Sequence, residues 1–284
     1  MKKRSTKEIK LQAKKALQGH VGTVLLGLLA VYGLNMLGTI LSTNLFSGTS
    51  PLDLVLSEVF MLVVSLIVGI ISAGFGYMLL NISRGKEFSL GDLGYFFKNQ
   101  PDRVIIAGFV LAVIQIVTAI PYYYVSFTTD PGLTVDSQIQ WLSMTLGLLA
   151  VSTLLNFLIS LPFAMTYFLM ADDTELGGLQ ALKESARLMK GNLWRYVKLN
   201  LSFVPLLLLS VFTFYIALFW IMPYMEMSMV AFYRDLDGEL DYRLPGNEGF
   251  GSFHNWTNDS GDGYDTENND GYRNDSEDDY NSEA

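Results

Sequence analysis

The chain has 284 residues, of which 50% are hydrophobic, 17% are charged and none is cysteine. The absence of cysteine excludes disulfides, thiolate nucleophiles and cysteine metal sites. The low charged fraction, against about a quarter in ordinary soluble domains, argues against a soluble protein. The net charge of −9 comes from the C-terminal segment, because residues 237–284 hold 14 acidic and 2 basic residues, whereas the preceding 236 residues carry a net charge of +3.

Five long stretches contain no Asp, Glu, Lys, Arg or His, and each is long enough to cross a bilayer core of about 30 Å. We therefore predict an all-α fold, a polytopic transmembrane helical bundle with short interfacial amphipathic helices in contact with the lipid bilayer. The stretches are Val21–Thr43, Phe60–Ile82, Val104–Thr129, Ser137–Ala171 and Leu199–Met225.

Three regions follow from this pattern. Residues 1–20 are expected to form a cytoplasmic basic amphipathic helix, and residues 21–236 a transmembrane helical domain. Residues 237–284 are rich in Asn, Asp, Gly, Ser and Glu, a composition that cannot bury a core, so a disordered acidic tail is expected there.

The N-terminal helix begins with a capping-box spacing, in which Ser5 caps the first turn and Glu8 reaches back to it. Apolar residues follow one face of this helix, lysines flank the other, and Gly19 suits its C-terminal cap. Such a helix fits the inner membrane surface, where anionic lipid headgroups attract basic residues. A topology signal without a ligand is the simpler interpretation. Binding of anionic lipid or of an unknown protein partner is the alternative.

The orientation follows from the positions of lysine and arginine. The first 20 residues hold seven of them, segment 83–103 holds four and segment 172–198 holds five, whereas segments 44–59 and 130–136 hold none. By the positive-inside rule the N-terminus and the two basic loops are cytoplasmic. The expected location is the cell membrane, as a multi-pass protein.

The number of crossings depends on the last apolar stretch. If Leu199–Met225 crosses once, the total is five and the acidic tail lies outside. Arg234 and Arg243 follow this stretch, and positive charge near a span favours a cytoplasmic C-terminus. We therefore favour six crossings over five, with the chain turning back near Thr213–Ala217. The fourth stretch would be about 50 Å long as one helix, so it must tilt, kink at Pro162 or lie partly along the outer interface.

A repeated unit supports the even count. Segments 13–20 and 185–192 each resemble a short amphipathic helix ended by a glycine, Gly19 or Gly191, and segment 90–98 is a looser version. Each would precede a membrane hairpin, which gives three units.

Polar residues within the spans are few: Asn35, Asn81, Gln115, Asn156 and Asn200. Helix packing is their ordinary role, and a polar lining for a substrate is the alternative. The chain has two isolated histidines and no phosphate-binding loop, zinc-protease or nucleophile-elbow motif. We predict no enzyme activity, no catalytic, cofactor-binding or metal-binding residue, and no nucleic-acid partner.

Three motifs between Ser185 and Leu236 resemble those of a known family. Ser185-x-x-Leu188-Met-Lys-Gly-Asn192-x-Trp194-Arg195, Pro223-Tyr224 and Ala231-Phe-Tyr-Arg-Asp-Leu236 resemble the DUF975 family of bacterial integral membrane proteins. The resemblance spans roughly residues 5–236. It implies a membrane protein of unknown function and supplies no functional residue. The family tends to have glycines in its last apolar region, where this chain has Phe214-Tyr-Ile-Ala217.

Our leading hypothesis is a non-enzymatic envelope scaffold or accessory protein, and the alternative is a transporter or channel for a neutral or lipidic substrate. The edges of the apolar stretches hold the candidate functional or interfacial residues. These are Gly191, Asn192, Trp194, Arg195, Pro223, Tyr224, Glu226, Tyr233 and Arg234.

Overall fold

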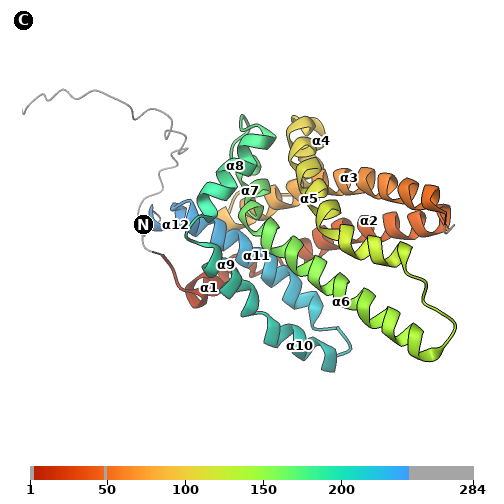
Figure 1. Cartoon of the computed structure of the whole chain (residues 1–284). Coiled ribbons are helices and arrows are strands. Elements are labelled where there is room, and N and C mark those ends of the chain that lie inside the picture. Colours follow the sequence, from red (N-terminus) through yellow and green to blue (C-terminus); the bar gives the residue numbers. More distant parts are fainter. Residues whose placement is uncertain (1–2, 48–49, 243–284) are drawn as a thin grey trace, which may run out of the picture. The chain divides into compact units, whose positions relative to one another are not determined.

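The structure is a computed structural model that describes residues 3–47 and 50–242. This part of the chain is helical throughout and contains no strand (Figure 1). The predicted disordered tail lies outside the described residues, apart from its first six positions. The elements are α1 (Thr6–Leu17), α2 (Val21–Leu45), α3 (Pro51–Arg84), the 3₁₀ helix η1 (Leu90–Gly94), α4 (Tyr95–Lys98), α5 (Pro101–Thr128), α6 (Val135–Ser160), η2 (Leu161–Phe163), α7 (Thr166–Asp172), α8 (Gly178–Met189), α9 (Leu193–Leu201), α10 (Val204–Phe212), α11 (Leu218–Leu236) and α12 (Glu239–Tyr242).

Three helical hairpins project from one compact end of the molecule (Figure 1). They are formed by α2 with α3, α5 with α6, and α9–α10 with α11, and each follows a short helix: α1, α4 or α8. The predicted helical bundle is therefore confirmed.

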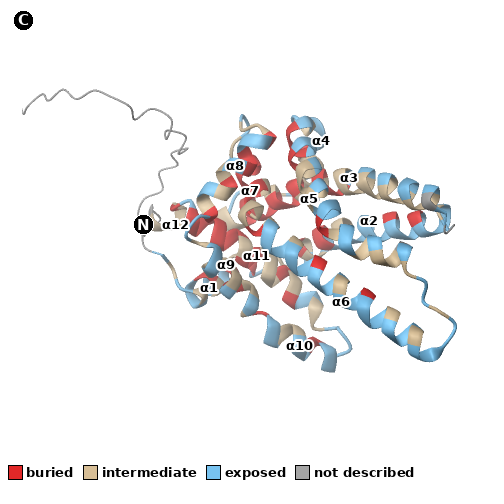
Figure 2. Ribbon diagram, viewed as in Figure 1, coloured by how far each residue is buried: buried red, intermediate tan, exposed pale blue. Residues whose placement is uncertain are grey.

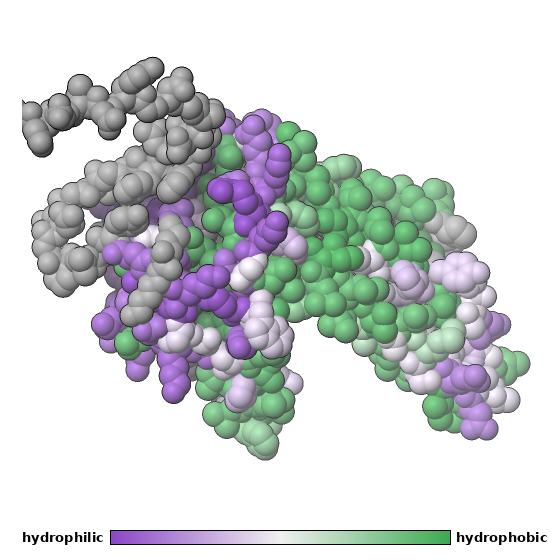
Figure 3. Space-filling model, turned by 60° about the vertical axis from the view of Figure 1, so that its left-hand side comes forward, coloured by the Kyte–Doolittle hydropathy of each residue, from purple (hydrophilic) through white to green (hydrophobic). Residues whose placement is uncertain are grey.

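The compact end, which we call the polar end, holds most of the buried core. It contains α1, α4, α7, α8, α9, α12, the second halves of α3 and α11, and the starts of α2 and α5. Buried residues concentrate there, whereas the projecting parts of the hairpins are largely exposed (Figure 2). Hydrophilic residues gather at one end of the surface, with a smaller group at the opposite end and hydrophobic surface between them (Figure 3). This banding is what a bilayer-spanning bundle requires, because lipid solvates the exposed apolar side chains.

Five helical segments among the described residues are long and apolar enough to cross a membrane. They are Val21–Leu45, Leu52–Arg84, Pro101–Ser126, Val135–Asp172 and Leu193–Phe212. Helix α11 has 19 residues but carries Glu226, Arg234 and Asp235, so it is not among them, and a sixth crossing stays a prediction.

The predicted reversal near Thr213–Ala217 is present between α10 and α11. Phe214 and Tyr215 adopt left-handed backbone angles there, with φ of 49° and 66°. Such angles ordinarily favour glycine. Because two aromatic residues occupy them here, the sequence carries no recognisable turn signal. The reversal returns α11 to the polar end.

The long fourth stretch breaks at Pro162, as one of our alternatives required, because α6 ends at Ser160 and η2 follows. Ser185 of α8 fills the break: its hydroxyl donates to Pro162 O at 2.8 Å and accepts from Met165 N at 3.1 Å. These bonds satisfy two backbone groups at the interruption between α6 and α7.

Helix α1 forms with the predicted capping box, but its apolar face is covered by protein. Ile9, Ala13 and Leu17 are buried, and α1 packs mainly against α11. The apolar face therefore does not lie in the membrane surface, and the exposed face carries the lysines.

Gly74 marks a very close backbone approach within the polar end. A Cβ atom at this position of α3 would lie 2.3 Å from Leu93 O and 2.6 Å from Asp92 O of η1. Only glycine lets these two helices meet at this distance.

Candidate functional site at the polar end

The polar end contains a network of ion pairs that joins α3, α7, α9, α11 and α12 to the N-terminal segment. We call it the charged network. Its members are Arg4, Arg84, Asp172, Arg195, Arg234, Asp235, Glu239 and Asp241.

Asp235 of α11 is the most deeply buried member, with a side chain only 1% exposed. Its Oδ1 accepts from Arg4 Nη1 at 3.2 Å, and its Oδ2 accepts from Arg195 Nη2. Arg195 also donates to Arg4 O at 2.9 Å and lies over the Phe232 ring, 5.4 Å from its centroid. One carboxylate thus holds two guanidinium groups from distant parts of the chain.

Arg4 continues the network to α12. Its guanidinium donates to Asp241 Oδ1 at 2.8 Å and to Leu240 O at 2.7 Å. The first and last described segments of the chain are therefore in direct contact and lie on the same side of the molecule.

Glu239 connects the arginines of α3 and α11. Arg84 Nη2 donates to Glu239 Oε2 at 2.9 Å, and Arg234 Nη2 donates to Glu239 Oε1 at 2.9 Å. Burial raises the pKa of this carboxyl group, but the hydrogen bonds and charges of the two arginines outweigh it, so the pKa is lowered from its ordinary value.

Arg84 and Arg234 have further partners that fix their positions. Arg84 Nη2 donates to Asp172 Oδ2 at 2.8 Å, and Tyr233 Oη donates to the same oxygen at 2.7 Å. Arg234 Nη1 donates to Ser83 O and Oγ, each at 2.6 Å. The bonds to Ser83 O and from Tyr233 tie the C-terminal ends of α3 and α7 to α11.

The turn between α8 and α9 positions Arg195. Gly191 adopts φ +78° directly after α8, a left-handed conformation that glycine takes without steric cost. Asn192 then accepts from Arg195 Nη1 at 3.1 Å through Oδ1, and its Nδ2 donates to Leu188 O at 3.0 Å. The glycine and the asparagine therefore direct the arginine toward Asp235.

The structure brings only some of the predicted residues together. Arg195, Tyr233 and Arg234 lie in or against the charged network, and Gly191 and Asn192 support it. The remaining four lie elsewhere.

Trp194 is 64% exposed, with Lys198 Nζ 5.5 Å from its ring centroid. Pro223 is buried within α11, and Tyr224 Oη donates to Lys10 O at 3.3 Å. Glu226 takes part in none of the network's ion pairs. It lies within electrostatic reach of Tyr32 on α2 and Tyr196 on α9.

Six members of the charged network were not among the predicted residues. Their sequence carries only a general signal, namely charge at the borders of apolar stretches. They are Arg4, Arg84, Asp172, Asp235, Glu239 and Asp241. The ion pairs join residues up to 237 positions apart, and nothing local in the sequence pairs them.

The carboxylates and arginines of the charged network neutralise one another. Each of its four carboxylates accepts from at least one of its four arginines. Within residues 3–47 and 50–242, no group of three or more His, Cys, Asp or Glu side chains could hold a metal ion. The arrangement supports bracing of the helix ends.

These features define the class of the protein: a multi-pass membrane protein, helical throughout its described residues, with a cluster of paired charges at one end. The chain belongs to the DUF975 family, described as "Protein of unknown function (DUF975)", whose profile matches residues 1–239. The predicted resemblance is therefore confirmed, over nearly the whole described chain. No curated protein and no solved structure matches the chain.

Proposed function

We propose that the protein is a non-enzymatic scaffold or accessory protein of the cell envelope. The charged network carries this proposal. Its acidic and basic groups pair with each other across the ends of α3, α7, α9, α11 and α12 and brace these helices against one another. Paired and partly buried ions of this kind hold helices in a fixed arrangement, which suits a protein that presents a surface to a partner.

The polar residues of the spans support the same role. Asn156 of α6 donates to Thr118 Oγ1 of α5 at 3.2 Å, so it joins the two helices of one hairpin. Asn35 and Gln115 are exposed on the outer surface of their helices. These amides therefore do not converge on one polar path through the bundle.

The orientation we propose places the polar end in the cytoplasm, with six crossings in three hairpins. Exposed lysines on α1, α8 and α9 would then face the anionic inner leaflet, each contributing about 1 kcal/mol to membrane attraction. They are Lys7, Lys14, Lys15, Lys183, Lys190 and Lys198. The exposed Trp194 beside Lys198 has the character of an interfacial anchor.

The test is site-specific cross-linking of the full chain in its native membrane. A photoreactive residue replaces Trp194 at the polar end, and the matched control replaces Leu149, which is exposed on α6. We expect one protein adduct of defined size from position 194 and none from position 149.

The competing function is tested on the same preparation. Purified protein in liposomes should give no flux of neutral solutes, and Asn156→Leu should leave the adduct at position 194 unchanged. Solute flux that Asn156→Leu abolishes, together with no adduct at position 194, would overturn the scaffold role in favour of a transporter or channel.

A further inference from the structure

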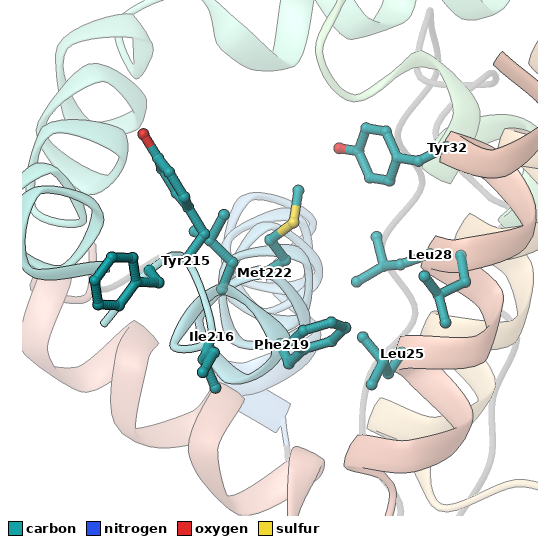
Figure 4. A pocket seen from close by; sticks show the side chains of 10 residues that line it. Leu25, Leu28, Tyr32, Tyr215, Ile216, Phe219 and Met222 are labelled. Carbon is teal, nitrogen blue, oxygen red and sulfur yellow. The ribbon is translucent and has the colours of Figure 1, made fainter. Parts of the chain in front are cut away.

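An apolar groove lies between α2 and the turn that joins α10 to α11. Its volume is about 450 Å³. Leu25, Leu28 and Tyr32 of α2 form one wall, and Ile216, Phe219 and Met222 form the other (Figure 4). The groove lies among the apolar parts of two hairpins, so lipid has direct access to it.

Glu226 continues the α11 wall of this groove toward the polar end. It follows Met222 by four residues, which places the two side chains on the same face of the helix, one turn apart. Its carboxylate is within electrostatic reach of the hydroxyl groups of Tyr32 and Tyr196. It therefore sits where α2, α9 and α11 meet.

The side chain of Glu226 is partly buried, and no ion pair to it is found among the described residues. A carboxylate in apolar surroundings is costly unless a cation or hydrogen-bond donors accompany it. Glu58, a carboxylate within the apolar helix α3, has such a donor: Tyr123 Oη donates to Glu58 Oε1 at 2.7 Å. Glu226 differs from it by having an adjacent groove in place of a donor.

The size and position of the groove select the ligand. At roughly 30 Å³ for each group the size of a water molecule, a groove of about 450 Å³ has room for about fifteen such groups, which is the volume of a long acyl chain. Its polar-end edge is where a lipid headgroup would lie, and there the chain presents an unpaired carboxylate. A headgroup with a protonated amine complements that charge.

We propose that this groove binds one acyl chain of a lipid whose headgroup carries a primary amine, and that Glu226 accepts the hydrogen bonds of the ammonium group. The proposal does not depend on the scaffold role, because neither Trp194 nor any member of the charged network lines the groove.

The test uses the full chain in phosphatidylcholine vesicles that contain a trace of phosphatidylethanolamine with a photoreactive acyl chain. We expect adducts on peptides that contain residues 25–32 and 214–222. Glu226→Gln should lower their yield about tenfold, because it removes a charge-assisted hydrogen bond. Glu58→Gln, which changes a membrane carboxylate away from the groove, should leave the yield unchanged.

A competition experiment on the unaltered protein keeps the proposal falsifiable if Glu226→Gln does not fold. Unlabelled phosphatidylethanolamine should suppress the groove adducts, whereas its N-acetylated form, which lacks the ammonium group, should not. Equal suppression by the two lipids, adducts spread evenly over all exposed helices, or a yield unaffected by folded Glu226→Gln would each overturn the assignment.

Discussion

Replacing Asp235 by alanine tests whether the charged network stabilises the fold. The carboxylate is 1% exposed, and its two arginine partners have side chains 19% and 21% exposed. Removing one partner from a buried ion pair costs about 3–5 kcal/mol, because the remaining charge is left without compensation. Partial solvent access to Arg4 and Arg195 moves the expected loss to the lower limit, about 3 kcal/mol.

Thermal unfolding of the purified protein in detergent measures this loss. For a chain of this size 1 kcal/mol corresponds to roughly 2–4 °C in Tm, so Asp235→Ala should lower Tm by roughly 6–12 °C. The matched control is Glu184→Ala, because Glu184 pairs with Arg187 three residues later on α8, and that arginine is 68% exposed.

An exposed pair of this kind contributes under about 0.5 kcal/mol, so the control should change Tm by no more than about 2 °C. Equal Tm shifts for the two variants would refute the claim that burial makes the charged network stabilising. A double-mutant cycle with Arg195→Ala then measures the coupling of Arg195 to Asp235 directly.

Two further predictions concern pH and packing. The folded-state pKa of Glu239 lies below its ordinary value of 4.5. The stability that this carboxylate contributes is therefore complete above pH 4.5 and is lost as the pH falls through the folded-state pKa. The Tm difference between the unaltered protein and Glu239→Gln should shrink below about pH 4.5, and a constant difference would contradict the assignment. Gly74→Ala should lower Tm, because its Cβ would lie 2.3 Å from Leu93 O. The control Gly33→Ala should not lower Tm, because no atom lies within 4 Å of its Cβ. Equal Tm values for the two variants would show that η1 can move away from α3.

The hairpin architecture was predictable because it depends on local properties of the chain. Uninterrupted apolar stretches define spanning helices whatever their neighbours are, and Pro162 ends a helix by its own chemistry. The reversal between α10 and α11 was expected from the repeated unit and from the positive charges that follow the last apolar stretch. No local turn signal indicated it, since Phe214 and Tyr215 occupy left-handed angles that ordinarily favour glycine.

The charged network and the position of α1 were not predictable, for a common reason. A lysine-rich amphipathic helix has the same pattern whether its apolar face lies on lipid or on α11. Similarly, Arg4 could pair with any carboxylate at the polar end, and the choice of Asp235 and Asp241 depends on how three hairpins converge. Such choices are set by tertiary packing, and a single sequence does not encode them locally.

The contact between Arg4 and Asp235 also bears on the order in which the molecule is made. The two residues are 231 positions apart, so at about 5–20 residues per second the arginine waits on the order of 10–50 s for its partner to be synthesised. During that interval α11 does not exist, and the apolar face of α1 has no protein to cover it. We expect the nascent α1 to rest on the membrane surface while the hairpins insert, and to leave it for α11 only when translation is nearly complete.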